Sequence, residues 1–370
     1  MTFKPTRRST AQRRPIGRRS EGGAALWMGG PALLLLTVFL VLPFFLAFTL
    51  SFTNQRLFSP NPTEFVGWRN FDRLLSVRVI ARPPEVDPVS GQPTRGAAGE
   101  VQPQSTRTAL ANTPALSEYR PGFEFQWSGQ SYAVVAKDPV FYRSLGNTTL
   151  FALIVVPLQT VLGLLLAVVV NRRVPGVGLF RAIYFLPVVT SIAVVSIIWV
   201  FLYNRDVGMI NQFVTLLTFN LVKPIDWLGS PRTAMLAIGL MSAWSAVGFQ
   251  MIIFLAGLQG IPAQLYEAAS IDGASAWQRF RFVTVPSLRN TTVFVVILTT
   301  VQAFSLFTQV DIMTQGGPLD STSTMMYRIV TKGTREQDIA SGSAMSVVYI
   351  LLIFGIALIQ RRLLAERKST

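Results

Sequence analysis

Six long apolar stretches constrain this chain more than any other feature of its sequence. A helix needs roughly 20 apolar residues to cross the hydrocarbon core of a membrane. The apolar windows are residues 24–52, 145–170, 178–203, 233–258, 291–310 and 344–360. None carries an ionised side chain away from its ends, and Arg181 lies near the end of the third, where a long side chain can reach the headgroups. The sequence therefore predicts an all-α membrane protein with six transmembrane helices.

The composition agrees with lipid as the main solvent. Half of the 370 residues are hydrophobic and 14% are charged, whereas soluble domains carry about 25% charged residues. The chain has no Cys and no His, which excludes disulfides, thiol chemistry and metal sites built from His and Cys. The commonest general base of enzymes is missing as well. We therefore expect no metal site and no enzyme.

The placement of charge predicts the orientation of the spans. With six spans, both termini share one side with the loops at 171–177 and 259–290. That side holds 17 basic and 4 acidic residues, against 16 basic and 14 acidic residues on the other. The positive-inside rule then places the N and C termini in the cytoplasm. The net charge of +15 is a topology signal beside lipid headgroups, so a nucleic-acid-binding face is disfavoured.

The predicted organisation has five parts. They are a basic cytoplasmic tail (1–23), a first transmembrane helix (24–52), an extracytoplasmic loop (53–143), a five-helix transmembrane core (144–365) that contains the cytoplasmic loop 259–290, and a C-terminal tail (366–370). The first helix is about twice as long as the apolar core of a signal peptide, and no small-residue cleavage site follows it, so we expect it to be retained.

The long outer loop contains a predicted flexible insertion over about residues 80–136. Its middle, 82–114, is rich in Pro, Gly and small polar residues and cannot bury enough surface to offset its ordering entropy. After it, aromatic and polar residues alternate, which predicts a short hairpin around Ser128-Gly129-Gln130. A solvated insertion and a docking surface for an extracytoplasmic partner both remain open.

The cytoplasmic loop 259–290 predicts two short helices under the membrane. Pro262 suits a first helical turn, and Gly273 tolerates the positive φ that ends a helix. A second helix is expected from Ser275, its N-cap, to Phe282, and Pro286 is expected to stop it before the fifth span. The loop also offers an apolar face and several charges, namely Tyr266, Ala269 and Trp277 with Glu267, Arg279 and Arg281. A bare amphipathic loop and a partner surface are both compatible with this pattern.

The same loop carries a motif with long fixed spacing. Glu267-Ala-Ala is followed after three residues by Gly273, and after nine more by Val283-Thr-Val-Pro286. This resembles the EAA motif of ABC importer permeases, E-A-A-x3-G-x9-I-x-L-P, with Val at both aliphatic positions. Other segments are similar to the sugar (maltose/glycerol-phosphate) branch: Asp138-Pro-Val-Phe141 with Asn147-Thr-Thr149, Phe180-Arg-Ala-Ile-Tyr-Phe-Leu-Pro187, and Met313-Thr-Gln-Gly-Gly-Pro318 with Ser321-Thr-Ser-Thr324. The resemblance covers about residues 28–365 except 80–136, and Glu336-Gln-Asp-Ile-Ala-Ser341 departs from it.

The resemblance implies the type I ABC importer permease fold and a coupling role for loop 259–290. The ATPase-coupling residues would be Glu267, Ala268, Ala269, Asp272, Gly273 and Pro286. Glu267 would pair with a basic residue of the ATPase, and Gly273 would give a sharp turn that a side chain would obstruct. Closure of the ATPase dimer would drive alternating access.

The resemblance also implies partners for the chain. They are a second homologous permease, a cytoplasmic ATPase dimer, an extracytoplasmic sugar-binding protein and the lipid bilayer of a prokaryotic inner (plasma) membrane. The sequence has no Gly-x4-Gly-Lys-Ser/Thr phosphate loop. The chain is therefore expected to bind no cofactor, with ATP and Mg held by the partner ATPase.

The transported solute is predicted less sharply. Polar residues inside spans are costly unless they are used, and Trp244, Gln250 and Gln302 are the preferred candidates for the substrate pathway. Hydrogen bonding between helices is the alternative role for such residues. Spans without ionised groups suit a neutral sugar, expected to be a di- or oligosaccharide, and glycerol phosphate or another polar solute stays open. A secondary transporter would need an ionisable group in its spans to couple protons.

Overall fold

The computed structural model describes residues 18–87, 90–96, 100–171 and 176–364, and it consists of two compact units, Met1–Thr49 and Leu50–Thr370. The first contains α1 (Arg18–Leu36), the π-helical η1 (Thr37–Val41) and most of α2 (Leu42–Leu50). Together they form one candidate membrane span, Trp27–Leu50, whose most apolar window has no residue buried within the protein. The π-helical turn precedes Pro43, which lacks the N–H that an α-helix would use.

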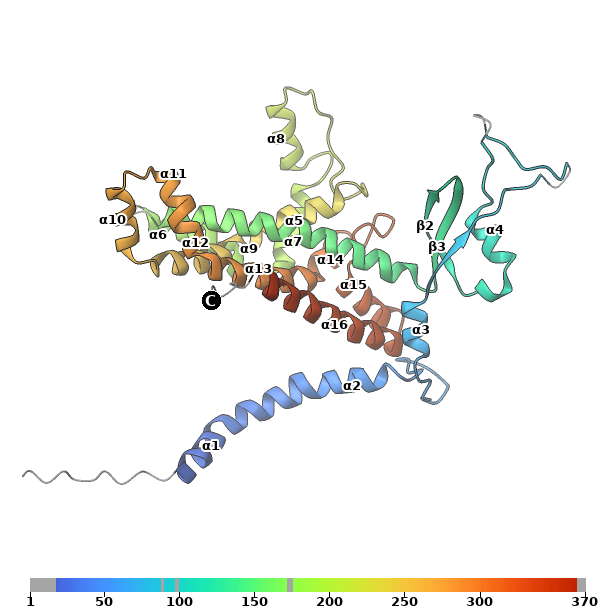
Figure 1. Cartoon of the computed structure of the whole chain (residues 1–370), viewed down its shortest axis with the longest axis horizontal. Helices are drawn as coiled ribbons and strands as arrows, with labels where there is room; N and C mark the ends of the chain where they lie inside the picture. Colours follow the sequence, from blue (N-terminus) through green and yellow to red (C-terminus); the bar gives the residue numbers. More distant parts are fainter. Residues whose placement is uncertain (1–17, 88–89, 97–99, 172–175, 365–370) are drawn as a thin grey trace, which may run out of the picture. The chain divides into compact units, whose positions relative to one another are not determined.

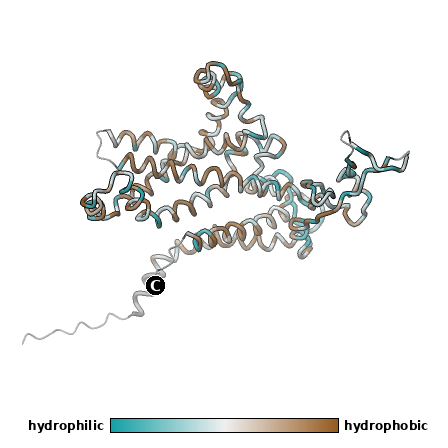
Figure 2. The backbone as a smooth tube through the Cα atoms, turned by 45° about the horizontal axis from the view of Figure 1, so that its top comes forward, coloured by the Kyte–Doolittle hydropathy of each residue, from teal (hydrophilic) through white to brown (hydrophobic). Residues whose placement is uncertain are grey.

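The second unit holds the remaining candidate spans. Three are single helices, α5 (Pro139–Val170), α9 (Ala234–Gln259) and α16 (Ile339–Leu364). Two bent helix pairs are further candidates, so the part of the chain that the structure describes has four candidate spans, or up to six if each bent pair is one span, by length and composition. Figure 2 shows hydrophobic residues along most of the length of these helices.

The third and fifth predicted spans are not the single straight helices that hydropathy indicates. The third is α6 (Val177–Val189) followed by α7 (Ile192–Leu202), with a bend of 98°. Pro187 and the extended Thr190 account for this break, because proline cannot supply its N–H and favours a kink. The fifth is α13 (Arg289–Phe304), which bends by 65° from the helical stretch before it and ends six residues before the predicted boundary.

Short elements connect the spans. They are α3 (Arg69–Leu75), α8 (Met209–Leu217), α10 (Ala263–Ile271), α11 (Ala276–Arg279), η3 (Phe280–Thr284), α12 (Val285–Ser287), α14 (Thr308–Met313), α15 (Met325–Val330) and η4 (Thr331–Arg335). In the second unit, α10 and α11 lie at one end of the long helices, and the sheet lies at the opposite end (Figure 1).

Helix α9 is the centre of the membrane core. Two thirds of its most apolar window is buried, against one third for α5 and α16. Its main cluster contains Ile238 and Met241, which pack with Phe151 of α5 and Phe304 of α13. A second cluster, around Met251 and nearer the α10 end, joins α9 to the last turns of α5 and the start of α13. The spans therefore pack around one buried helix.

A small antiparallel sheet occupies part of the predicted insertion. Strands β1 (Val77–Ala81), β2 (Arg120–Trp127) and β3 (Gln130–Ala136) pair in the order β1-β3-β2. One face of β3 packs on α4 (Thr106–Ala111) and on η2 (Pro114–Leu116). The predicted hairpin is confirmed, with Ser128 and Gly129 both at positive φ, as a two-residue hairpin turn requires. The insertion is thus more regular than its composition indicates, and its flexibility stays a prediction.

Candidate functional site

The loop between α9 and α13 is a helix–turn–helix. Helix α10 carries Glu267, Ala268 and Ala269 and ends at Ile271, with Asp272 as its C-cap. Helix α11 begins after Ser275, whose hydroxyl accepts from the Gln278 N–H while the Gln278 amide oxygen accepts from the Ser275 N–H. This reciprocal pair is a capping box, which satisfies two free N–H groups at the helix start. The sequence prediction of Ser275 as N-cap is confirmed.

Gly273 makes the turn between the two helices. Its φ is +77°, its N–H donates to Ser270 and the N–H of Ala274 donates to Ala269. These two bonds form the Schellman arrangement that closes a helix with a left-handed residue. A Cβ added at Gly273 would meet nothing within 4 Å. A side chain here would therefore meet no neighbouring group, and the positive φ alone is what disfavours it and favours glycine.

Pro286 does not end the second helix as predicted. Helical structure continues from α11 through η3 and α12 to Ser287, and the 65° bend falls at Leu288. The π-helical η3 ends two residues before Pro286, just as η1 ends two residues before Pro43. Such a turn accommodates the missing proline N–H without breaking the helix. Pro286 is exposed on this stretch.

The helix–turn–helix presents a mixed apolar and acidic surface. Glu267, Ala268, Asp272 and Gly273 are exposed, and Ala269 is half-buried. Large apolar side chains beside them are unusually exposed: Ile271 by 86%, Phe282 by 68%, Trp277 by 66% and Leu265 by 46%. The sequence prediction named Trp277 as part of the apolar face and did not include the other three. Such exposure in one loop indicates an interaction surface.

Polar contacts hold the two short helices in place. The Tyr266 hydroxyl shares a hydrogen bond of 2.9 Å with Thr284 of η3, and the guanidinium of Arg279 donates to Ser270 over 2.9 Å. Behind the loop, a groove of about 520 Å³ lies between Trp277, Phe280 and the last turns of α5. The two hydrogen bonds therefore join α10 to α11 and η3, so the helix–turn–helix is held together as one unit.

A second candidate site is a cavity of about 200 Å³ between the spans. Its polar lining consists of Gln159 from α5, Ser242 and Ser245 from α9, Thr299 and Gln302 from α13, and Gln309 from α14. Gln302 is exposed to this cavity, as the pathway prediction requires. Gln309 was missed because it lies at the end of the predicted fifth span, where hydropathy shows only a fading apolar run.

Gln250 lies behind this cavity. Its side chain is fully buried, and its amide donates to Gln159 Oε1 over 3.0 Å and to Thr299 over 3.3 Å. The amide of Gln159 donates in turn to the carbonyl oxygen of Ser242. This chain of amides links α5, α9 and α13, which is the helix–helix role left open above. Contact of Gln250 with substrate stays a prediction, and its place in the structure is that of a support.

Trp244 belongs to a separate aromatic row. It is 48% exposed and contacts Trp199 of α7, with ring centroids 5.5 Å apart. Tyr203 and Trp227 continue the row at 5.2 and 5.6 Å. Trp244 does not line the polar cavity with Gln302. The three predicted pathway residues are thus distributed over a cavity wall, its supporting layer and an aromatic row.

Residues 159–368 match the family model described as "Binding-protein-dependent transport system inner membrane component". This chain belongs to that family. Among its relatives, the probable ABC transporter permease protein YurN of Bacillus subtilis is 31% identical over 272 residues, covering 69% of this chain and 93% of that protein.

Two further relatives carry more specific names. The trehalose/maltose transport system permease protein MalF of Thermococcus litoralis is 34% identical, covering 62% of this chain and 77% of that protein. The sn-glycerol-3-phosphate transport system permease protein UgpA of Yersinia enterocolitica is 32% identical, covering 67% of this chain and 83% of that protein. A bacterial ABC transporter that imports alginate shares the fold, with a TM-score of 0.65 and 15% identity, covering 96% of this chain and all of that one. The chain is an importer permease.

Two of the three segments that resemble the sugar branch of this family, the one around Asn147 and the one around Ser323, meet in space. Asn147 donates from its amide to the carbonyl oxygens of Asp320 and Ser323, over 2.7 and 3.0 Å. Ser144 shares a hydrogen bond with Ser323, and Thr148 accepts from the N–H of Met325. The loop after α14 is thereby fastened to the first turns of α5. The polar residues of both permease segments thus stabilise one junction near the sheet end of the core.

Proposed function

We propose that this chain is a transmembrane subunit of an ATP-driven importer that carries a sugar, a di- or oligosaccharide, into the cell. In this proposal it spans the membrane six times, counting each bent pair as one span, with both termini in the cytoplasm. The observation that carries the proposal is the exposed helix–turn–helix around Glu267, at the end of the spans opposite the sheet. Positive charge concentrates on the side of that loop.

In the proposed complex, the helix–turn–helix seats in a cytoplasmic ATPase dimer, which holds ATP and Mg. The exposed apolar side chains, Ile271, Phe282 and Trp277, would be covered on docking, and Glu267 would pair with a basic residue. A second homologous permease completes the pathway, and an extracytoplasmic sugar-binding protein delivers the solute. The membrane is a prokaryotic inner membrane. The loop joins α9 directly to α13, and this connection supports the role, because motion of the ATPase would reach both spans.

The cavity between α5, α9 and α13 supports a neutral substrate. Its polar lining consists of amides and hydroxyls from Gln159, Gln302 and Gln309 with three Ser and Thr side chains. Such groups hydrogen-bond the hydroxyls of a sugar without a net charge. Relatives named for trehalose/maltose and lactose transport agree with a sugar. Relatives named for sn-glycerol-3-phosphate transport favour glycerol phosphate or another polar solute as the second candidate.

A double substitution tests the coupling role. Glu267→Ala removes the exposed anion, and Gly273→Pro is incompatible with φ of +77° and removes the bond to Ser270. In vesicles that contain the complete complex, we expect ATP hydrolysis to continue while uptake is lost. Gln264→Ala, an exposed change on the same helix, is the matched control. Normal uptake by the double variant would contradict the coupling role.

Two further measurements test the assignment. Gentle purification of the chain from its native membrane should bring an ATPase subunit with it, and the absence of any ATPase would contradict the importer. A panel of sugars and glycerol phosphate, each added with its binding protein, should then stimulate the ATPase selectively. Stimulation by glycerol phosphate alone would favour the second candidate.

A further inference from the structure

A charged pocket lies at the end of the second unit opposite the helix–turn–helix, away from the cavity between the spans. It has a volume of about 570 Å³ and is built from four separate parts of the chain: α3, the start of β2, the turn into α5, and α15 with η4. Its charged lining is Arg73, Glu118, Arg120, Lys137, Asp138, Arg328, Lys332 and Glu336. Five of these are basic and three acidic, so the lining carries a net positive charge.

The acidic groups of the pocket are already engaged. Glu336 pairs with Arg328 and, over 2.6 Å, with Lys332. Glu118 lies 3.0 Å from the ammonium of Lys137. Burial acts to raise the pKa of Glu336, but the hydrogen bond from Lys332 and the charges of Arg328 and Lys332 outweigh it, so this carboxyl stays ionised. The acidic side chains therefore neutralise the lysines and part of Arg328.

Asp138 is engaged in a different way. Its carboxylate caps α5 by accepting from the N–H of Phe141 over 3.1 Å. A capped helix start offers little attraction of its own to a further anion. The remaining positive charge of the pocket therefore comes from its arginines.

Three arginines keep unused hydrogen-bonding capacity. Arg73 and Arg120 are exposed, and within the described part of the chain neither has an acidic partner. Arg328 is mostly buried, and its Nε–H is enclosed without any acceptor among the described residues. A buried donor left without a partner costs about 1–3 kcal/mol. Guanidinium groups present a planar set of donors that matches carboxylate and phosphate oxygens.

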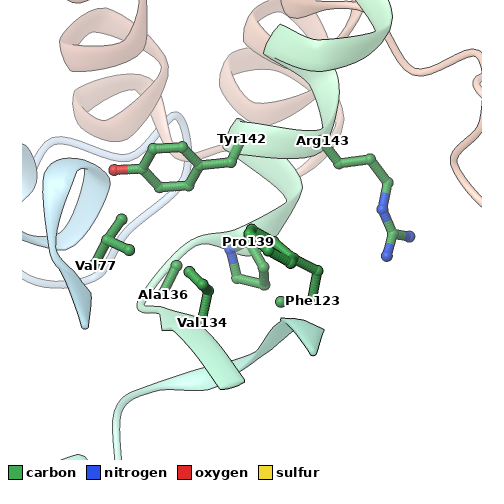
Figure 3. A pocket seen from close by; sticks show the side chains of 8 residues that line it. Val77, Phe123, Val134, Ala136, Pro139, Tyr142 and Arg143 are labelled. Carbon is green, nitrogen blue, oxygen red and sulfur yellow. The ribbon is translucent and has the colours of Figure 1, made fainter. Parts of the chain in front are cut away.

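We infer that this pocket binds the carboxylate or phosphate group of a small water-soluble anion. Arg73 and Arg120 supply the accessible charge, and Arg328 supplies a donor held in place by Glu336. Next to it, and sharing Pro139, lies an apolar pocket of about 490 Å³ lined by Val77, Phe123 and Tyr142 (Figure 3). This neighbour offers apolar surface beside the anion site. The site is independent of the transport pathway and of the coupling loop.

The test is a binding measurement on the full purified chain in nanodiscs of phosphatidylcholine, which has no net charge. The probes are inorganic phosphate, galacturonate, and galactose as the neutral partner of galacturonate. We expect saturable binding of phosphate and galacturonate, none of galactose, and weaker binding as salt rises. The double variant Arg73→Gln with Arg120→Gln should bind at least about tenfold more weakly, because it loses two charged donors.

Two controls make the test decisive. Arg107→Gln removes an exposed arginine of α4 outside the pocket and should leave binding unchanged. Arg73→Lys with Arg120→Lys keeps the charge and should restore part of the affinity. Equal binding by the glutamine double variant, or binding of galactose as strong as that of galacturonate, would overturn the inference. So would a requirement for phosphatidylglycerol in the nanodisc with no binding of soluble anions, which would assign the site to a lipid headgroup.

Discussion

Gly248 of α9 sets how closely two spans approach. A Cβ at this position would lie 2.2 Å from the carbonyl oxygen of Tyr184 in α6, whereas contacts below 3.0 Å essentially do not occur. The obstacle is backbone, so no change of rotamer can relieve it, and Gly248→Ala must separate α6 from α9 by about 1 Å. Overpacking of this kind costs about 1–3 kcal/mol.

The comparison variant is Gly146→Ala in α5. A Cβ there would meet nothing within 4 Å, and alanine favours helix over glycine by up to about 1 kcal/mol. The two variants make the same chemical change, so their unfolding free energies should differ by about 2–4 kcal/mol. Gly163→Ala should fall between them, because its Cβ would meet the Cβ of Gln250 at 2.7 Å.

The assay is equilibrium unfolding in mixed micelles, followed by tryptophan fluorescence. Each variant is compared with the unchanged chain at one detergent composition, because unfolding free energies depend on it. If Gly248→Ala proves as stable as Gly146→Ala, then α6 and α9 do not pack as closely as the structure shows. The explanation of Gly248 as a contact glycine would then fail.

Three other outcomes follow from the described contacts. Gly273→Asn should retain most coupled uptake in the reconstituted complex and Gly273→Val should lose it, because asparagine tolerates positive φ and open space surrounds the turn. Asn211→Leu should speed proteolytic cleavage of loop 204–233, because the buried amide of Asn211 bonds the carbonyl oxygens of Arg205 and Ile225 and accepts from Trp227. The hydrogen bond from Lys137, followed by that from Ser76, holds the pKa of Asp72 below its ordinary 3.8. The unchanged chain should therefore melt at a higher temperature than Asp72→Asn above about pH 4. This difference in melting temperature should close as the pH falls through the lowered pKa.

A specific result would contradict each of these three predictions. Equal uptake by the asparagine and valine variants would show that φ at Gly273 does not matter. For Asn211→Leu, Thr215→Ala on the same helix is the control, and equal cleavage of the two would remove the anchoring role of the asparagine. A melting-temperature gap for Asp72→Asn that does not narrow while the pH is lowered until this carboxyl is protonated would show that the ion pair is not its cause.

Hydropathy predicted α9 to within one residue at each end because its apolar run is continuous. The same method could not detect the 98° bend at Thr190, since a window average registers how apolar a stretch is and not where its backbone turns. Strand β1 was missed for a related reason. Its partner β3 lies more than 50 residues later, and Val77–Ala81 shows no alternation by itself. Pairing over such a distance depends on tertiary packing.

Among the site residues too, those determined by local structure were predictable from the sequence, and those determined by tertiary packing were not. The turn at Gly273 and the cap at Ser275 were predictable because local hydrogen bonding determines both. Polarity alone made Gln250 and Gln302 equal candidates for the substrate pathway. In the structure Gln250 supports the cavity wall, whereas Gln302 lines the cavity. Which face of a span a glutamine occupies depends on neighbouring helices. A chain surrounded by lipid has little amphipathic pattern from which to read that orientation.

Three glycines of α9 each face a different neighbour. A Cβ at Gly239 would meet Ile154 and Val155 of α5, one at Gly248 would meet α6, and one at Gly257 would meet Thr291 of α13. A helix turns by about 100° per residue, so inserting a single residue between Gly239 and Gly248 would rotate the later two away from their partners. Length change should therefore be tolerated in the sheet segment and selected against in α9. Over evolutionary time, the sheet segment can lengthen while α9 keeps a fixed number of residues.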